Sequence, residues 1–214
     1  MEKYKPISLI APWDFTPMIQ ALPDTGNLLE IGPFCGSSTV YWADGFIDAG
    51  KTWKIHSVDM FRGMDVNHPN PEIRKHMSNF AMTGEEQLYR FKQAIKPYDN
   101  ITWEKRWLYN EQAGFMGEDR PINVEDYIPP FEVTALFYDA NHTYSILRRL
   151  LEHIGKDIPY IFVNSYYDAW PGTMRAVDEF VQKYNKQMSV LRGNQYIKGK
   201  GEKQEYRTYV ACIV

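Results

Sequence analysis

The chain contains little cysteine and no long hydrophobic run, and each absence excludes a class of protein. Only two cysteines, Cys35 and Cys212, occur in 214 residues, and they lie far apart, which excludes a disulfide-stapled fold and a cysteine-ligated metal site. No stretch approaches the ~18 consecutive apolar residues that a membrane span needs. Residues 1–6 lack the apolar segment of a signal peptide. We therefore expect a cytoplasmic protein without a membrane partner.

A strong excess of one charge is also missing. The formal net charge is −3, and Lys and Arg are not gathered into the basic footprint that a nucleic-acid backbone requires. The lysines between Lys198 and Lys203 alternate with Gly199, Gly201 and Glu202, which is typical of a solvated hairpin loop. We therefore expect no nucleic-acid partner.

The most informative stretch lacks the residues of a phosphate-binding loop. An apolar run, Leu28–Ile31, leads into a glycine turn, Gly32–Gly36, that opens a helix. A P-loop needs a Lys after its last glycine, and a dinucleotide fingerprint needs one glycine more. Glu30 stands where a buried strand favours an apolar residue, so it needs a partner such as the ammonium or hydroxyl groups of a cofactor. An ordinary strand-to-helix turn is the alternative interpretation.

A second acidic residue ends the next apolar stretch. Residues 53–59 are expected to form a strand that finishes at Asp59, about two dozen residues after the glycine turn, where nucleotide folds place a ribose-binding acid. An ionised carboxylate accepts hydrogen bonds only, so it suits the two hydroxyls of a ribose. A helix cap or a turn aspartate is the alternative.

Strand-like and helix-like stretches alternate, which is typical of a parallel sheet covered by helices on both faces. The expected helices are 13–22, 37–49, 85–95, 145–154 and one that starts at 171–180. The expected strands are 28–32, 53–59, 101–107, 134–138, 160–163, 188–198 and 206–214. We predict a single α/β domain over residues 1–214. Its last two strands are joined by a short loop, which allows a hairpin.

Two further strands end in polar residues. Asp139, Asn141 and His142 follow the strand at 134–138, and Asn164 and Ser165 follow the strand at 160–163. Open α/β sheets bind ligands outside the carboxyl ends of their strands. We therefore expect these side chains to share one crevice with Glu30 and Asp59.

Two connections are longer than is usual. Residues 61–82 and 108–130 are expected to be lid insertions over a ligand, and simple packing loops are the alternative for each. Aromatic residues near the same rim fit a ring or a sugar face of a substrate, and rim packing explains them equally well. They are Trp107, Tyr166, Tyr167 and Trp170.

Three motifs carry a resemblance to a known family. The glycine turn reads E-I-G-x-F-x-G-x-S-T and resembles the first motif of class I S-adenosylmethionine-dependent methyltransferases. Together with D-A-x-H-x-Y at 139–144 and P-G-x-x-R-A-V-D-E-F at 171–180, it looks like the small O-methyltransferases of the macrocin and cephalosporin-hydroxylase-like group. The resemblance covers Leu28 to Phe180. It implies a doubly wound, mostly parallel seven-stranded sheet with a C-terminal antiparallel hairpin.

The resemblance also implies a cofactor and an activity. The cofactor is S-adenosylmethionine, and the acceptor is a hydroxyl of a small molecule or a sugar. The cofactor-binding residues implied are Glu30, Gly32, Phe34, Gly36, Ser38, Asp59, Met60 and Asp139. A homo-oligomer is a further expectation.

The chain departs from the metal-dependent members of this group. Their magnesium is held by an aspartate that matches Asp139 and by two adjacent acids that match Asn164 and Ser165, and a catalytic acid matches Asn141. Only the aspartate is retained. Because Mg²⁺ is usually held through carboxylates, we expect no metal ligand set and a doubtful role for magnesium.

The candidate catalytic residues are His142 and Asp139. The unperturbed pKa of histidine, near 6.5, suits proton abstraction at neutral pH. The alternative for His142 is a helix-start residue satisfied by backbone groups. Three functions stay open: an O-methyltransferase, an inactive methyltransferase-like protein that binds the cofactor or a partner, and an aminopropyl-type transferase. The last would need more acids in the crevice for a polyamine.

Overall fold

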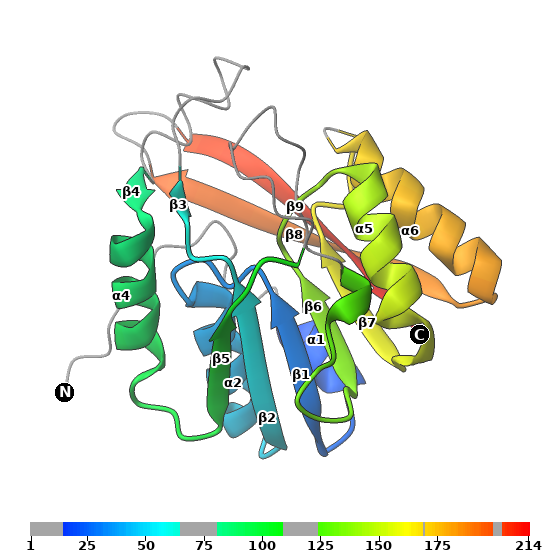
Figure 1. Cartoon of the computed structure of the whole chain (residues 1–214). Coiled ribbons are helices and arrows are strands. Elements are labelled where there is room, and N and C mark those ends of the chain that lie inside the picture. The colour runs from blue at the N-terminus through cyan, green and yellow to red at the C-terminus, as the bar shows by residue number, and fades with distance from the viewer. Residues whose placement is uncertain (1–14, 65–80, 109–123, 169, 199–202) are drawn as a thin grey trace.

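The computed structural model describes residues 15–64, 81–108, 124–168, 170–198 and 203–214. Its sheet has seven strands in the order β5-β2-β1-β6-β7-β9-β8 (Figure 1). Five are parallel, namely β1 (Thr25–Ile31), β2 (Thr52–Asp59), β5 (Ile101–Lys105), β6 (Ala135–Tyr138) and β7 (Tyr160–Asn164). The last two, β8 (Met188–Lys198) and β9 (Lys203–Ile213), are antiparallel. The predicted fold class is therefore confirmed.

Helices cover both faces of the sheet. On one face lie α1 (Thr16–Ala21), α2 (Ser37–Asp48) and α4 (Gly84–Ile95), and on the other lie α5 (Tyr144–His153) and α6 (Pro171–Tyr184), nearest the viewer in Figure 1. Two single turns of 3-10 helix, η3 (Val124–Asp126) and η4 (Gly155–Asp157), flank α5. In the described part of the chain, no helix has the length and apolarity to cross a membrane.

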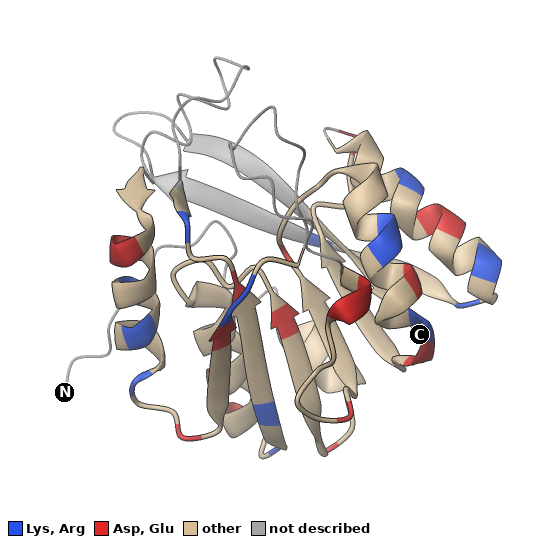
Figure 2. Ribbon diagram, in the orientation of Figure 1, with Lys and Arg blue, Asp and Glu red and all other residues tan. Residues whose placement is uncertain are grey.

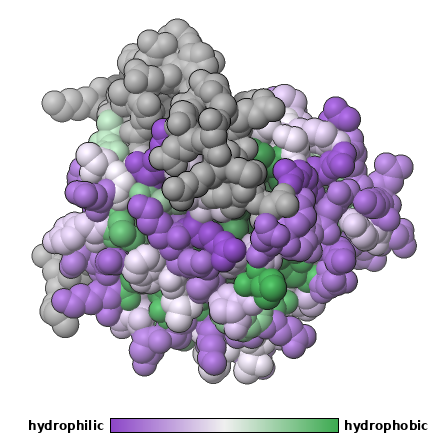
Figure 3. Space-filling view, in the orientation of Figure 1, coloured by the Kyte–Doolittle hydropathy of each residue, from purple (hydrophilic) through white to green (hydrophobic). Residues whose placement is uncertain are grey.

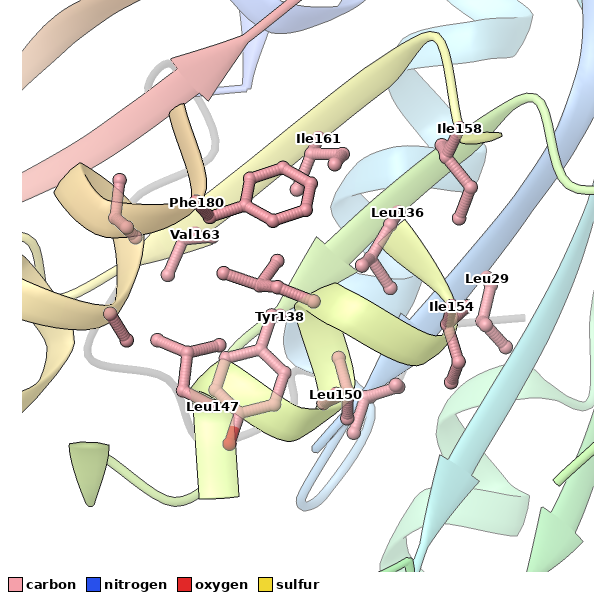
Figure 4. Packing of buried hydrophobic residues seen from close by; sticks show 14 of the residues in the cluster. Leu29, Leu136, Tyr138, Leu147, Leu150, Ile154, Ile158, Ile161, Val163 and Phe180 are labelled. Atoms are coloured by element: carbon pink, nitrogen blue, oxygen red, sulfur yellow. The ribbon is translucent and has the colours of Figure 1, made fainter. Parts of the chain in front are cut away.

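The two faces have cores of different character. Under α5 and α6 the core is mainly aliphatic, with Leu136, Leu147 and Phe180 among its members (Figure 4). Under α1 and α2 it is rich in aromatic rings, and Phe46 stacks on Trp53 with centroids 4.8 Å apart. Seen from the α5 and α6 side, those helices carry mostly hydrophilic side chains on their outer surface (Figure 3). Their apolar residues are therefore turned toward the sheet, as expected for amphipathic helices.

The expected insertions are only partly described. The segment 61–82 contributes β3 (Gly63–Met64), which pairs with β4 (Met82–Thr83), and the segment 108–130 contributes η3. Residues 65–80 and 109–123 lie outside the described residues, so the lid assignment stays a prediction. Trp13 and Asp14, at the start of the first expected helix, also lie outside them.

The order of the strands reverses between β1 and β6. The chain moves outward from β1 to β2 and β5, then crosses back to β6 on the other side of β1. Open α/β sheets bind ligands outside the carboxyl ends of the strands at such a point, and we call this edge of the sheet the crevice. The residues that follow these two strands are the glycine turn and Asp139.

Candidate functional site

The glycine turn at 32–36 has a backbone that requires glycine at both ends. Gly32 and Gly36 have φ values of +89° and +86°, in the left-handed region that other residues rarely adopt. A Cβ on Gly32 would overlap the backbone carbonyl of Asp139, and one on Gly36 would lie 3.2 Å from Phe91 and Ala94. Phe34 also has a positive φ, of +50°. The glycines therefore let the turn pack against the end of β6 and against α4.

Glu30 lies at the centre of a buried hydroxyl cluster. Its carboxylate accepts hydrogen bonds from Ser38 Oγ at 2.5 Å, Thr39 Oγ1 at 2.5 Å and Ser57 Oγ at 2.7 Å. These donors come from the first turn of α2 and from β2. Burial raises the pKa of Glu30 despite the three hydrogen bonds, which oppose that rise. The partner expected from a cofactor is thus supplied by the protein itself, and a direct cofactor contact stays a prediction.

Asp59 ties the glycine turn to the end of β2. Its Oδ2 accepts from the backbone N–H of Phe34 at 3.1 Å, and its Oδ1 accepts from that of Phe61 at 2.7 Å. Gln87 Nε2 from α4 lies 3.4 Å from Oδ2, and the backbone of Met60 adds a further hydrogen bond. Burial nevertheless raises the pKa of Asp59 to about 6. The carboxylate therefore shapes the turn, and its role toward a ribose is untested.

Asp139 and Asn164 meet across the ends of β6 and β7. Asn164 Nδ2 donates to Asp139 Oδ1 at 2.8 Å, and only 5% of the Asn164 surface is exposed. Burial raises the pKa of Asp139 to about 6, and the amide hydrogen bond works against that rise. Asn164 Oδ1 is buried and has no hydrogen-bond partner among the residues that the structure describes. This pair presents one carboxylate and one free amide oxygen at the crevice.

His142 follows Asp139 and packs against Trp170. The two ring centroids lie 4.3 Å apart, and His142 Nδ1 is buried with no hydrogen-bond partner in the described part of the chain. Burial lowers the pKa of His142 from the unperturbed value of 6.5 to about 4, because the ring is shielded from water. A catalytic role for His142 stays a prediction.

Three carboxyl groups lie near the carboxyl ends of the adjacent strands β1, β2 and β6. They belong to Glu30, Asp59 and Asp139, each has a raised pKa with burial as its largest cause, and no cation stands among the causes. Figure 2 shows acidic positions toward these ends of the strands and mixed charges along α5 and α6. An ionised carboxylate held this way is stabilised by a cation or by further donors. The crevice thus favours a cationic ligand rich in hydroxyl or amine donors.

The described residues contain no group of three His, Cys, Asp or Glu side chains arranged to hold a metal ion. Asn164 lies beside Asp139 and donates a hydrogen bond to it, and Ser165 has a left-handed backbone with a φ of +63°. Asn141 uses its Oδ1 to accept from the backbone N–H of Thr143 at 2.7 Å. Among these residues, Asp139 is the one carboxylate.

Sequence reasoning missed several residues of the site. Gln87 bridges three parts of it, because its side chain reaches the Phe34 carbonyl, Asp59 and the backbone N–H of Gly63. Thr39 and Ser57 share the Glu30 carboxylate with Ser38. The buried glutamate was a signal that hydroxyl partners were needed, whereas nothing in the sequence around Gln87 indicated its contacts.

Comparison with known proteins gives a likeness in structure only. No protein-family model matches the sequence, and no curated protein matches it. A precorrin-6y C5,15-methyltransferase from Geobacter metallireducens superposes with a TM-score of 0.53 at 13% identity, covering 92% of this chain and 85% of that one. The O-methyltransferase NovP also gives 0.53, at 17% identity, over 83% of this chain and 71% of its own.

A third solved structure widens the range of activities among the neighbours. It is a putative RNA methyltransferase from Pyrococcus horikoshii, with a TM-score of 0.52 at 8% identity, covering 94% of this chain and 79% of that one. At such low identity a likeness carries the fold and not the substrate. The chain has the Rossmann-like fold of class I S-adenosylmethionine-dependent methyltransferases.

Proposed function

We propose that the protein transfers a methyl group from S-adenosylmethionine to a hydroxyl of a small molecule, with little or no dependence on a metal ion. The observation that carries the proposal is the position of Glu30, Asp59 and Asp139 at the carboxyl ends of three adjacent strands, β1, β2 and β6, next to the glycine turn. A cationic donor beside them would lower each pKa and offset the cost of burial. The resemblance to macrocin-type O-methyltransferases supports the same assignment.

The cofactor, when bound, supplies a methyl group on a positively charged sulfur. The chain itself then has to hold that ligand, align the acceptor and remove one proton. We assign the holding role to the glycine turn and to Asp59, which retains lone pairs on both oxygens for ribose hydroxyls while it fixes Phe34 and Phe61. Glu30 acts through α2, because it anchors the first turn of that helix by two hydroxyls.

Proton removal is assigned to Asp139. With a pKa of about 6 it is ionised at neutral pH and still able to accept a proton. His142, with a pKa of about 4, is neutral at that pH, and a neutral imidazole offers one accepting nitrogen to orient the acceptor. His142 is thus a hydrogen-bonding residue in this proposal, and Asp139 is the base.

The first test is calorimetric titration with S-adenosylhomocysteine, with and without magnesium. We expect binding that magnesium leaves unchanged, and an affinity at least tenfold weaker in Asp59→Ala. Glu132→Ala is the matched control, since Glu132 is an exposed carboxylate away from the crevice. Failure of the wild-type protein to bind under either condition would contradict the proposal.

Metal dependence is tested by turnover in the presence of a chelator. The single carboxylate at the Asp139–Asn164 pair should hold Mg²⁺ weakly, so we expect activity to persist. Loss of activity with chelator and its return with magnesium would overturn this part of the proposal.

An inactive cofactor-binding protein is the second candidate. It is favoured by the amide of Asn164 and the hydroxyl of Ser165 beside Asp139, where the resembling enzymes carry acids. Tight S-adenosylhomocysteine binding without turnover of any hydroxylated compound would select it over the enzyme.

A further inference from the structure

A row of four aromatic rings runs from the crevice to the root of the β8–β9 hairpin. It consists of His142, Trp170, Tyr167 and Tyr209. His142 packs on Trp170, Trp170 Nε1 donates to Tyr167 Oη at 3.0 Å, and the rings of Tyr167 and Tyr209 lie 5.8 Å apart. All four residues are half-buried. Each therefore leaves part of its surface open along this aromatic row.

The backbone that carries the aromatic row is held by hydrogen bonds. The N–H of Trp170 donates to the carbonyl of Tyr167 at 2.8 Å, and the carbonyl of Trp170 accepts from Thr173 at 3.0 Å. Gly172 lets this loop approach His142, because a Cβ at that position would lie 2.8 Å from the His142 carbonyl. A surface fixed in this way binds a ligand without the cost of ordering itself.

The inner end of the aromatic row is polar. His142 Nδ1 and Asn164 Oδ1 are both buried and have no hydrogen-bond partner among the described residues, and Asn164 Nδ2 donates to Asp139. Leaving buried polar atoms unpaired is unfavourable, so a polar ligand group that pairs with one of them would gain affinity. Aromatic side chains thus lie next to unpaired polar atoms at this end of the row.

The hydroxyl of a sugar and the hydroxyl of a phenol could both bind there, and they differ in acid strength. An alkyl hydroxyl resembles water, whose pKa is about 15.7, whereas a phenolic hydroxyl has a pKa of about 10. The pKa of an ordinary aspartate, about 3.9, lies far closer to that of a phenol than to that of an alcohol. Deprotonation by the Asp139 carboxylate is therefore much less unfavourable for a phenol than for a sugar.

We propose that the methyl acceptor is a phenol, whose flat ring lies along the aromatic row and whose hydroxyl lies beside Asn164 and His142 and donates its hydrogen bond to Asp139. This inference rests on the proposed methyl transfer. In the reaction the phenolic O–H bond breaks and its proton passes to the Asp139 carboxylate. The phenolic oxygen forms the new bond to the methyl carbon. The bond between that carbon and the sulfur of S-adenosylmethionine breaks, and the sulfur keeps its electron pair.

The test uses β-naphthol and its saturated counterpart, decahydro-β-naphthol, with methyl glucoside as a sugar probe. We expect β-naphthol to be methylated with a kcat/KM at least tenfold above that of the other two. Loss of an aromatic contact in Trp170→Leu should weaken β-naphthol binding and raise its KM by about 3- to 10-fold. Trp170→Phe keeps a ring and should stay within about twofold of the wild type.

Further variants distinguish the loss of an aromatic contact from a general loss of folding. Tyr167→Leu should weaken β-naphthol binding more than Tyr167→Phe, and Tyr89→Leu is the control, because Tyr89 is 63% exposed on α4 and away from the aromatic row. Direct β-naphthol binding is followed by its own fluorescence, and S-adenosylhomocysteine affinity by calorimetry. The latter should be unchanged in all of these variants.

The outcomes separate the two proposals. Turnover of methyl glucoside in preference to β-naphthol, or β-naphthol binding that is insensitive to both leucine substitutions, would overturn the phenol assignment while leaving methyl transfer in place. If S-adenosylhomocysteine does not bind, the proposal of methyl transfer is contradicted. The aromatic row is then upheld or refuted by direct β-naphthol binding in the wild type and in Trp170→Leu.

Discussion

Asp139 and His142 lie close together in the chain, and burial moves their pKa values in opposite directions. The pKa of Asp139 is raised from 3.8 to about 6, and that of His142 is lowered from 6.5 to about 4. Because the pKa of Asp139 is higher in the folded state, this residue favours folding most below its unfolded pKa of 3.8. That stabilisation is lost as the pH rises through 6. His142 acts in the opposite sense, and its contribution grows as the pH rises from 4 to 6.5.

The substitution Asp139→Asn tests the direction in which Asp139 makes stability depend on pH. The substituted amide oxygen can still accept from Asn164, while the buried negative charge disappears. We expect the free energy of unfolding to rise by about 1–3 kcal/mol above pH 6 and to change little near pH 4. Urea unfolding at several pH values measures it. A gain of the same size at every pH would contradict the titration of Asp139 as its cause.

The same residue should set the pH dependence of turnover. Because the base must be ionised, we expect kcat/KM to rise up to pH about 6 and then level off. Asn164→Ala removes a hydrogen bond that lowers the pKa of Asp139, so the rising limb should move to higher pH. An unmoved limb would mean that another group titrates.

Glu30→Ala should act on stability as well as on binding. It leaves the hydroxyls of Ser38, Thr39 and Ser57 without their buried acceptor. We expect the free energy of unfolding to fall by about 1–3 kcal/mol. Glu132→Ala, at an exposed position, should change it by less than about 0.5 kcal/mol. Equal stability of the two variants would show that the hydroxyl cluster relaxes without Glu30.

At the scale of elements, the glycine turn joins β1 to α2 through a left-handed residue. Gly36 is the N-terminal cap of α2 and has no side chain to bond the first N–H groups. The first turn is instead held by Ser38 and Thr39, whose hydroxyls bind Glu30 at the end of β1. The position of this helix start therefore depends on the buried carboxylate.

Gly36→Ala and Gly50→Ala form a matched pair. Both glycines have a positive φ, but a Cβ on Gly50 meets nothing within 4 Å, while one on Gly36 lies 3.2 Å from Phe91 and Ala94. Each substitution should cost about 1–2 kcal/mol in backbone strain. We expect Gly36→Ala to lose more than this and also to weaken S-adenosylhomocysteine binding. Thermal unfolding and calorimetry would show it, and equal losses would contradict the packing argument.

The ends of two elements, β1 and α6, are not where hydrophobic spacing alone would place them. The expected strand 28–32 is in fact Thr25–Ile31, because its first residues pair with the start of β2 and with Thr134 of the β6 approach. The helix expected to start at 171–180 runs on to Tyr184 and is followed by Asn185 in the left-handed conformation. Both differences come from partners distant in sequence or from a cap that hydrophobic spacing does not reveal.

At the scale of the whole molecule, the β8–β9 hairpin extends past the rest of the sheet. β9 pairs with β7 over Val210–Ile213 only, yet it pairs with β8 along its full length (Figure 1). The sheet-bound part therefore includes the buried residues Val210, Ala211 and Ile213. The outer part has backbone pairing within the hairpin alone, which is marginally stable by itself.

Shortening this hairpin should leave the sheet folded. If residues 194–207 are replaced by an Asn-Gly turn, the pairs of β9 with β7 remain. We expect cooperative unfolding with a midpoint within about 5 °C of the wild type, because a 1 kcal/mol loss shifts such a chain by only a few degrees. Circular dichroism during heating measures it. A non-cooperative transition would show that the outer hairpin is part of the folding unit.

The sequence by itself determined the alternation of elements, the parallel sheet with its terminal hairpin and the crevice edge, because hydrophobic period and turn residues act locally. It also placed Glu30, Asp59, Asp139 and His142 at that edge. Only the tertiary structure decided what they do there, since pKa values and free lone pairs depend on burial and on partners from other elements. It is the fold that gives Glu30 three hydroxyl donors, lowers the pKa of His142 by burial, and assembles the aromatic row.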